Sequence, residues 1–529
     1  IYTTKDNAIT NIGTDKTTGI VLDVNGGGTQ VFGLKTDKDA KATLQAKTVS
    51  IRANNNTSSP IKGISTAGET SILADNAELS VSGKNVSGIE FSTPKGNVSI
   101  QAKNKLSIHV DGKDGSGVGI IGSYGKASLS ADVLDISAKG KMAKIVSSQK
   151  NATVELGKGA SVVNLQAEGI DEAYAVDSVK PSTIKIGEDA GQIHIISKAG
   201  KTAHGVSLDN VSHLTMGGAD TDISIEAHAA GETIGVLAMQ EKGSTTGGAS
   251  VDIKGNSLSI NAISDTNDSI GIHVQNSSTA AEDNKATVNV DVENTTINAK
   301  TALSVMSQGV LKVNSNLVTH GKNAILTRGN STVNINTDGK HTTNLNGDIV
   351  FDFDKTTSVD SEVNVNLSGE GSQWTGNTRV DWKNDSGKPD EANLAVTGMK
   401  LNLSDGATWT PTAVKNKTAD KSGSNYVALN QLSIDNGVVN LDSDKLDANS
   451  PVKVEKISGN GTITTNSLDN KLVIDDKATG TKLKVEGSGE IGDKILAGKA
   501  PLVGLAGTAN VGDKTASDVG ERAGGLMAG

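Results

Sequence analysis

Carboxylates are the side chains of this 529-residue chain with the most scope for chemistry, because the chain has no cysteine and only eight histidines. Two carboxylates about 5–10 Å apart can hydrolyse a glycosidic bond. Asp220, Asp222 and Asp252 are candidate members of such a pair, since residues one repeat apart become neighbours when repeats stack. Solvated acidic turn residues are the alternative interpretation, and it is the one we expect here.

A second acidic stretch runs from Asp348 to Asp354, with Phe351 and Phe353 between the acids. Its carboxylates could hold a metal ion, because oxygen ligands suit hard cations. A charged strand face is the alternative that we prefer. We therefore predict no metal and no cofactor in this stretch.

The basic and imidazole side chains also give no clear indication of a catalytic or metal-binding site. Arg52 and Arg328 are the only arginines in the repeat region, and neither lies in an acidic cluster of the sequence, as lyase chemistry would require. No His-Glu-x-x-His spacing occurs among the histidines, which are His109, His194, His204, His213, His228, His273, His320 and His341. We expect His194, His228 and His273 to point outward from strands. The prediction is that the chain has no catalytic residues and is not an enzyme.

The elements that must position these side chains belong to an internal repeat of about 30 residues between Gly33 and Ala302. Each repeat starts with an anchor, a small or lysine residue followed by an aliphatic one. The anchors are Gly33-Leu34, Gly63-Ile64, Gly88-Ile89, Gly117-Val118, Lys144-Ile145, Ala175-Val176, Gly205-Val206, Gly235-Val236, Gly271-Ile272 and Ala302-Leu303. Two short runs of alternating apolar and polar residues follow each anchor.

Alternation with a period of two predicts strands with one buried face. A 30-residue unit with three such strands cannot bury that face alone, whereas stacking the next unit on it can. We therefore predict an all-β fold, a parallel β-helix of three sheets, and right-handed crossovers make the helix right-handed. A helical solenoid is excluded because each repeat is rich in Gly, Asn, Ser and Thr. Aromatic residues make up 2% of the chain, which suits a narrow aliphatic interior.

The charge and the composition of the chain limit the classes of binding partner that we expect. The net charge is −10, and neither a basic stripe nor interleaved aromatic residues are present, so we expect no nucleic-acid partner. No run of 18 apolar residues occurs. The absence of cysteine is compatible with export. The loops at residues 239–249 and 276–286 are long, and we expect them to decorate a binding face, with tolerated loop length as the alternative.

Several blocks in the last third of the chain resemble a known family. They are Asn346–Ile349 (NGDI), Gln373–Gly376 (QWTG), Leu401–Trp409 (LNLSDGATW), Leu432–Leu441 (LSIDNGVVNL), and the series Ser458–Ile463, Asn470–Ile474 and Ala478–Gly489. In this order they resemble the secreted passenger of a monomeric (type V) autotransporter, AIDA-like or pertactin-like. The last series is similar to the autochaperone cap of such passengers. Asn470 departs from the pattern, which commonly has Asp before Lys-Leu.

The repeat, whose exposed end needs a cap, and the resemblance together imply a domain organisation. Residues 1–32 would form an N-terminal cap and residues 33–397 the β-helix passenger, with a period that shortens after residue 302. Residues 398–510 would form the C-terminal β-helix and autochaperone region. Residues 511–529 would be a linker toward a translocator barrel outside this chain, through which the protein would be anchored in the outer membrane.

The function that this resemblance implies is adhesion at the surface of a Gram-negative-type bacterium, after export across the outer membrane. The passenger would mediate aggregation and biofilm formation through self-association between neighbouring cells, or attachment to a protein or glycan of host or partner cells. A surface polysaccharide-active β-helix enzyme, a lyase or glycosidase, is the alternative. The scarcity of aromatic residues argues against a sugar-stacking cleft.

Overall fold

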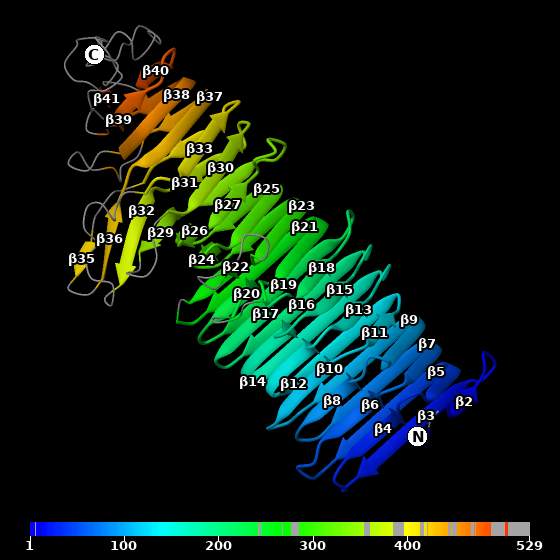
Figure 1. Cartoon of the computed structure of the whole chain (residues 1–529). Coiled ribbons are helices and arrows are strands. Elements are labelled where there is room, and N and C mark those ends of the chain that lie inside the picture. Colours follow the sequence, from blue (N-terminus) through cyan, green and yellow to red (C-terminus); the bar gives the residue numbers. More distant parts are fainter. Residues whose placement is uncertain are drawn as a thin grey trace. The chain divides into compact units, whose positions relative to one another are not determined.

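The computed structural model describes residues 1–5, 7–241, 244, 246–266, 268–276, 285–353, 360–383, 396–412, 417–419, 422–442, 446, 452–466, 470, 472–487 and 503–505 (Figure 1). These residues form strands and no helix, and the strand pairs are almost all parallel. The prediction of an all-β fold with parallel strands is confirmed. The chain divides into two compact units, unit 1 (Ile1–Val292) and unit 2 (Glu293–Gly529).

Unit 1 contains three parallel ladders, which we name A, B and C. Ladder A comprises β1 (Tyr2–Thr3), β4 (Val31–Thr36), β6 (Ile61–Thr66), β8 (Val86–Phe91), β10 (Ser116–Gly122), the second half of β12 (Val133–Ser148), the second half of β14 (Val162–Ser178), β17 (Thr202–Asp209), β20 (Thr233–Met239) and β22 (Ser269–Gln275). Successive strands are one repeat apart, as in the pair Ser148 and Ser178, which are 30 residues apart.

Ladders B and C share several long strands. Ladder B comprises β2 (Ile9–Gly13), the first halves of β5 (Lys41–Asn55), β7 (Glu69–Ser82) and β9 (Asn97–Asp111), then β11 (Lys126–Ser130), β13 (Ala152–Leu156), β15 (Ser182–Ile186), β18 (His213–Met216) and the first part of β21 (Ser250–Ser264). Ladder C comprises β3 (Gly19–Gly26), the second halves of β5, β7 and β9, the first halves of β12 and β14, then β16 (Gln192–Ala199), β19 (Asp222–Ala229) and the second part of β21.

The remaining strands begin with β23, which starts in unit 1 and ends in unit 2. Their bounds are β23 (Thr287–Asn298), β24 (Thr301–Met306), β25 (Val310–His320), β26 (Asn323–Arg328), β27 (Thr332–Ile335), β28 (Thr343–Asn346), β29 (Asp348–Phe353), β30 (Glu362–Ser368), β31 (Gln373–Thr375), β32 (Thr378–Lys383), β33 (Met399–Ser404), β34 (Thr408–Thr410), β35 (Lys417–Ala419), β36 (Ser422–Tyr426), β37 (Leu429–Asn440), β38 (Val452–Thr465), β39 (Leu472–Lys477), β40 (Lys482–Gly487) and β41 (Val503–Leu505). In unit 2, β24 pairs with β26 at an offset of 22 residues, whereas Asn334 and Asn364 pair at 30. Strand β36 is antiparallel to β32 and β35.

The anchors of the sequence repeat lie in ladder A. Leu34, Ile64 and Ile89 pair in register, as predicted. The next two anchors were assigned wrongly, because Ile89 pairs with Ile120 and Ile120 pairs with Val146. Gly117-Val118-Gly119-Ile120 repeats the small-aliphatic pattern two residues apart, so the sequence alone does not distinguish the two registers. The true anchors there are Gly119-Ile120 and Ile145-Val146.

Anchor glycines are required by close stacking of the backbone. A Cβ on Gly235 would lie 2.6 Å from the carbonyl oxygen of Gly271 and 2.4 Å from Ile260 Cγ2. Gly63 is equally confined by Gly88 O, at 2.7 Å, and by Leu79. Contacts below 3 Å are closer than carbon atoms tolerate, so Gly63 and Gly235 cannot be replaced by larger residues without a shift of the backbone. The position is not glycine in every repeat, because the buried Ile145 occupies it in β12.

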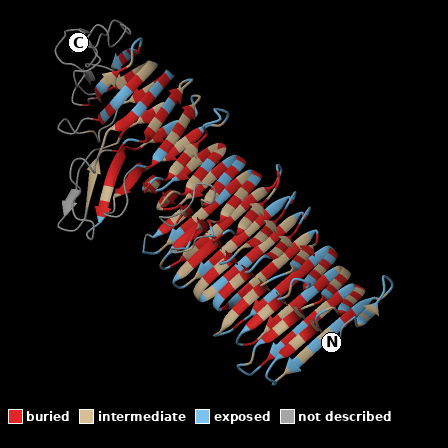
Figure 2. Ribbon diagram, viewed as in Figure 1, coloured by how far each residue is buried: buried red, intermediate tan, exposed pale blue. Residues whose placement is uncertain are grey.

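Figure 2 shows the expected alternation of buried and less buried residues along the strands of unit 1. Strand β19 alternates without a break, with Ile223 and Ile225 in the interior. Strands β17 and β20 of ladder A differ, because nearly all of their residues are buried on both faces. The outer face of ladder A is therefore the place where side chains outside the core are shielded from water.

The predicted domain boundaries at residues 32, 397 and 510 stay predictions. Residues of the predicted N-terminal cap already pair with the repeats, since β2 and β3 both pair with β5. All of residues 384–395 and nearly all of residues 488–529 lie outside the described residues. In the described part of the chain, no helix is long and apolar enough to cross a membrane.

Candidate functional site

The outer face of ladder A carries a group of interacting polar side chains that we call the charged cluster. Its members are Lys144, Tyr174, Asp177, His204, Asp209, Glu232 and Glu241. Strand register places Lys144, Tyr174 and His204 side by side on β12, β14 and β17, one per repeat. The stacking of repeats therefore assembles a cluster from residues that are about 30 positions apart in the chain.

Contacts link these side chains across the strands. Lys144 Nζ lies 2.5 Å from Asp177 Oδ2 and 5.4 Å from the centre of the Tyr174 ring. The His204 ring meets the Tyr174 ring edge-on, with centroids 5.1 Å apart. His204 Nε2 lies 2.9 Å from Glu232 Oε1. His204 and Asp177 are only 5% and 6% exposed, whereas the side chain of Glu232 is 58% exposed, so the chain of contacts runs from a shielded centre to the solvent.

Asp209 is the chemically most unusual member of the cluster. Its pKa is raised from 3.8 to about 7, first by burial and then by the nearby carboxylates of Asp177 and Glu241, while the Lys144 ammonium acts in the opposite direction. Its Oδ1 atom is buried and has no hydrogen-bond partner. A carboxyl group that titrates near neutral pH can donate or accept a proton there.

Glu232 has the opposite shift. The hydrogen bond from His204 lowers the pKa of this carboxyl, more than its burial raises it. The cluster thus contains one carboxyl group that favours its proton and another that favours its charge. Such a pair is one requirement for acid–base chemistry, although it also occurs in structural ion networks.

The three acidic residues singled out in the sequence do not form a pair. Asp222 is in ladder C and accepts hydrogen bonds from Asn256 Nδ2 at 2.9 Å and Ser257 Oγ at 2.6 Å, which lower its pKa. Asp252 is in ladder B and accepts a hydrogen bond from Asn289 Nδ2 at 2.8 Å. Asp220 lies exposed in a turn. Asp220 is a solvated turn residue, as expected, whereas Asp222 and Asp252 lie in strands β19 and β21, so the expected turn position is wrong for these two.

The acidic stretch from Asp348 is engaged by arginines. Asp348 forms an ion pair with Arg379, and Asp352 with Arg328. Arg328 lies in no acidic cluster of the sequence, but the pairing of β26 with β29 brings Asp352, 24 residues further along the chain, beside it. Phe351 is fully buried, and Asp354 lies outside the described residues. Arg52 is exposed.

The histidine predictions hold in part. His194 and His228 are partly exposed, with His194 near Gln192 and His228 Nε2 3.7 Å from Asp265. His273 does lie on the outer face, but it is 7% exposed, because the outer face of ladder A is shielded. Nowhere in the described ranges do three His, Asp or Glu side chains form a group that could hold a metal ion.

The two long loops start next to the cluster. Glu241, in the loop 239–249, donates its backbone N–H to Asn210 Oδ1 at 3.0 Å. Gln240 N–H bonds to the carbonyl of Gln275, at the start of the loop 276–286, at 2.8 Å. Residues 242, 243, 245 and 277–284 are outside the described part. Whether these loops bind a partner stays a prediction.

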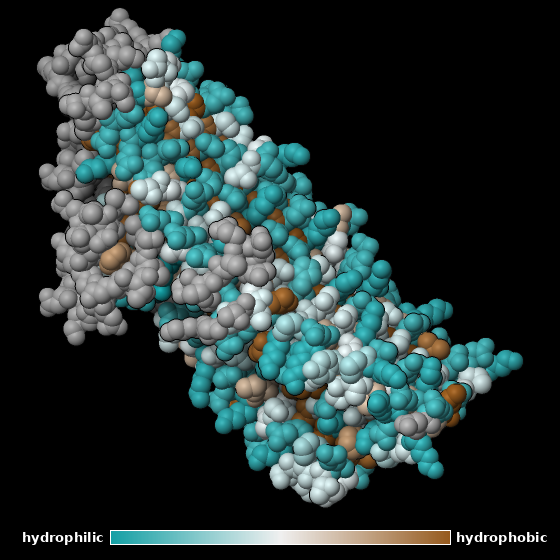
Figure 3. Space-filling view, in the orientation of Figure 1, coloured by the Kyte–Doolittle hydropathy of each residue, from teal (hydrophilic) through white to brown (hydrophobic). Residues whose placement is uncertain are grey.

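The sequence reasoning missed most of the charged cluster. A signal was present, since Lys144, Tyr174 and His204 recur at the 30-residue spacing of the repeat. Asp177 and Asp209 could not be recognised as interacting, because their approach depends on the register of two strands and on burial of the outer face. The face of the molecule shown in Figure 3 is mainly hydrophilic, with hydrophobic residues scattered over it.

Comparison of the chain with protein-family models, with curated proteins and with solved structures gave no significant match.

Proposed function

We propose that the chain is an adhesive passenger of the autotransporter type, displayed on the cell surface after export. In this proposal the parallel ladders of unit 1 wind as a right-handed β-helix, and the last part of unit 2 is an autochaperone cap. The one-repeat offset between paired strands supports the β-helix, and the motif blocks of the last third of the sequence support the family.

The observation that carries the adhesive function is the repetition of polar side chains on the outer surface of unit 1. Ion pairs join one repeat to the next at many exposed positions, among them Lys41–Glu69, Lys105–Asp135, Lys126–Glu155 and Lys139–Glu168. Such a surface offers the same hydrogen-bonding groups again and again. Each contact contributes only about 0.5–1.5 kcal/mol, but repeated contacts between many displayed copies add avidity.

The partner in this proposal is another copy of the chain on a neighbouring cell, or a protein or glycan of a host or partner cell. Neither a nucleic acid nor a cofactor is part of the proposal. The acidic net charge of −10 opposes binding to another polyanion.

The test uses bacteria that display the chain and labelled bacteria that do not. We expect displaying cells to settle rapidly in still culture and to exclude the labelled cells, because binding would occur between copies of the chain. Settling that included both kinds of cell equally would indicate attachment to another surface component. No settling and no attachment to host cells would contradict the adhesive function.

A surface glycan-active enzyme is the second candidate, and Asp209 is the observation that favours it. Its raised pKa beside Asp177 and Glu241 resembles the environment of a general acid. The test is the release of reducing ends from bacterial and host polysaccharides by the purified chain. Release that disappears in Asp209→Asn but persists in Asp222→Asn would support the enzyme, and no release would contradict it.

A further inference from the structure

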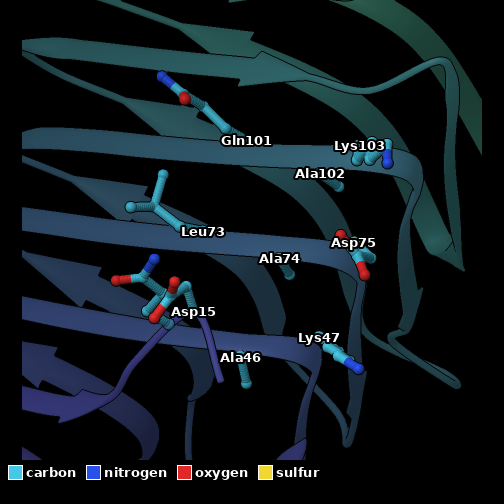
Figure 4. A pocket seen from close by; sticks show the side chains of 10 residues that line it. Asp15, Ala46, Lys47, Leu73, Ala74, Asp75, Gln101, Ala102 and Lys103 are labelled. Carbon is cyan, nitrogen blue, oxygen red and sulfur yellow. The ribbon is translucent and has the colours of Figure 1, made fainter. Parts of the chain in front are cut away.

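Ladders B and C meet along an open groove of about 480 Å³ that crosses β5, β7 and β9 (Figure 4). Its residues form three columns, because the strands are in register. Ala46, Ala74 and Ala102 form the floor. On one side lie Leu73 and Gln101, with Gln45 in register with them, and on the other lie Lys47, Asp75 and Lys103, with Asp15 at one end.

The groove lies where three continuous strands change from one ladder to the other. Each of β5, β7 and β9 passes from ladder B to ladder C just after its alanine, and the register between β7 and β9 shifts between Ala74 and Asn76. Side chains on the two sides of the bend diverge, and a methyl group fills little of the space between them. The result is a channel that runs from repeat to repeat, with adjacent strands about 4.8 Å apart.

Charged groups along this channel are available to a ligand. Several exposed lysines elsewhere in unit 1 pair with an acid of the next repeat, as Lys41 does with Glu69 at 2.9 Å. Lys47, Asp75 and Lys103 are also one repeat apart, yet within the described ranges they form no such ion pair. Their hydrogen-bonding capacity is therefore directed to solvent or to whatever occupies the groove.

We propose that this groove binds an uncharged oligosaccharide that lies along the stacked repeats. Two lysines and two aspartates line it, so the formal charges cancel and neither a polyanion nor a polycation is favoured. Amide, carboxylate and ammonium groups together supply donors and acceptors, which match hydroxyl groups that are both. Leu73 and Ala74, which are partly exposed, offer small apolar contacts to the C–H face of a sugar ring, whereas Ala46 and Ala102 are buried.

A peptide fits the groove less well. An extended peptide gains most of its affinity by adding backbone hydrogen bonds to a free strand edge. The strands under the groove have none to offer, because β7 is already paired with β5 on one side and β9 on the other. Side-chain recognition of hydroxyl groups is the mode that these strands leave open.

The ligand proposal depends on the proposed adhesive function only for its biological role, since binding can be measured on the purified chain. Gln45 and Gln101 are two repeats apart, so their backbone positions lie about 10 Å from each other and their side chains can hold different sugar units of one chain. A single monosaccharide would contact only one of them. We therefore expect affinity to rise with the length of the oligosaccharide.

The experiment measures binding of neutral hexasaccharides of glucose, mannose and N-acetylglucosamine to the purified chain by calorimetry and saturation-transfer NMR. We expect at least one to bind, with an affinity that changes less than twofold between low and high salt. Ala74→Trp fills the floor of the groove and should weaken binding at least tenfold. The double variant Gln45→Ala/Gln101→Ala removes the amides without adding bulk and should weaken it severalfold.

Gln166→Ala is the matched control, because Gln166 is an exposed glutamine on β14, away from the groove. It should bind like the unchanged chain. Failure of all three hexasaccharides to bind would overturn the proposal, and so would equal binding by both groove variants. Binding confined to a sulfated or uronate-containing oligosaccharide and abolished by salt would also overturn it, because the ligand would then be an anion.

The settling assay with displaying cells distinguishes a failure of the groove proposal from a failure of the proposed adhesive function. If Ala74→Trp abolishes hexasaccharide binding while cells still settle together, the groove is a glycan site and self-association uses another surface. If the unchanged chain binds the hexasaccharide but displaying cells neither settle nor attach, the adhesive function fails and the glycan site stands.

Discussion

Unit 1 and unit 2 both stack parallel strands, but they fill the interior with different side chains. In unit 1 the interior consists mainly of Ile, Val, Leu and Ala columns, such as Ile195 and Ile225, which pair in register. Unit 2 has larger and more polar groups inside. Trp374 stacks on Trp409 with ring centroids 5.5 Å apart, and the fully buried Asn336 has its side chain satisfied by Ser315 and Thr343.

Charges are distributed differently as well. Ion pairs of unit 1 are mostly exposed, with both side chains of Lys139 and Glu168 at least half open to solvent. In unit 2, Arg379 is 7% exposed in its side chain and bonds to Asp348, Asp381 and Asn323. Removing one partner of a buried ion pair strongly destabilises the folded state, because the other charge is left buried and unpaired. Exposed ion pairs contribute little to the free energy of unfolding. The comparison indicates that parallel ladders of the same kind are stabilised mainly by close packing in unit 1 and by specific buried polar interactions in unit 2.

The largest effect is expected when Arg379 is replaced by Met. The substitution leaves Asp348 buried without its cation and removes the guanidinium from Asp381, so unit 2 should lose about 3–5 kcal/mol of stability. Urea unfolding followed by tryptophan fluorescence measures this, because all three tryptophans, Trp374, Trp382 and Trp409, belong to unit 2. A loss below 1 kcal/mol would show that the ion network is not what distinguishes the units.

A pH-dependent effect comes next, at Asp209. Because its folded pKa, about 7, is above its ordinary value of 3.8, the folded state binds the proton more tightly than the unfolded state. The free energy of unfolding is therefore highest at low pH and falls as the pH rises from about 4 to about 7. The expected loss is about 1.4 kcal/mol for each unit by which the folded and unfolded pKa values differ.

Asp209→Asn should remove this dependence. We expect the variant to gain about 2–4 kcal/mol relative to the unchanged chain when the pH is raised from 4.5 to 7.5, since asparagine does not ionise. Hydrogen exchange of the β17 amides reports the effect in unit 1, which has no tryptophan. Parallel pH profiles for the two proteins would contradict the assignment.

The substitution Gly235→Val tests whether close packing of the backbone stabilises unit 1. The new Cβ would meet the carbonyl oxygen of Gly271 and the side chain of Ile260, so overpacking should cost about 1–3 kcal/mol or more. Gly27→Val is the control, because a Cβ there would have Thr57 at 3.9 Å as its nearest neighbour. Faster exchange of β20 and β22 amides in the Gly235 variant alone is the expected result.

The sequence predicted strands and parallel stacking because both depend on local alternation and on a regular period. It missed the register at Gly119-Ile120, since Gly117-Val118 has the same pattern two residues earlier and only packing against Ile89 decides between them. It also missed the antiparallel β36, because an excursion from the repeat has no period to reveal it.

Candidate sites were harder to predict than the fold. Asp222 and Asp252 were close in type and spacing, but they belong to different ladders, and their partners are Asn and Ser side chains of the next repeat. Asp209 was not singled out, because its unusual pKa arises from burial of the outer face of ladder A. Spacing predicts which residues stack, and burial then determines which of them have altered chemistry.

Lys139→Ala should have the smallest effect, and it completes the contrast with Arg379. Lys139 Nζ lies 2.9 Å from Glu168 Oε2, but both side chains are hydrated, so removing the lysine should change the stability of unit 1 by less than about 0.5 kcal/mol. Salt at 1 M shortens the screening length to about 3 Å and should erase even this difference. Hydrogen exchange of β12 and β14 at low and high salt measures it. A loss above 2 kcal/mol that persists in salt would mean that exposed ion pairs, and not only the close packing of glycine and isoleucine columns, hold the repeats of unit 1 together.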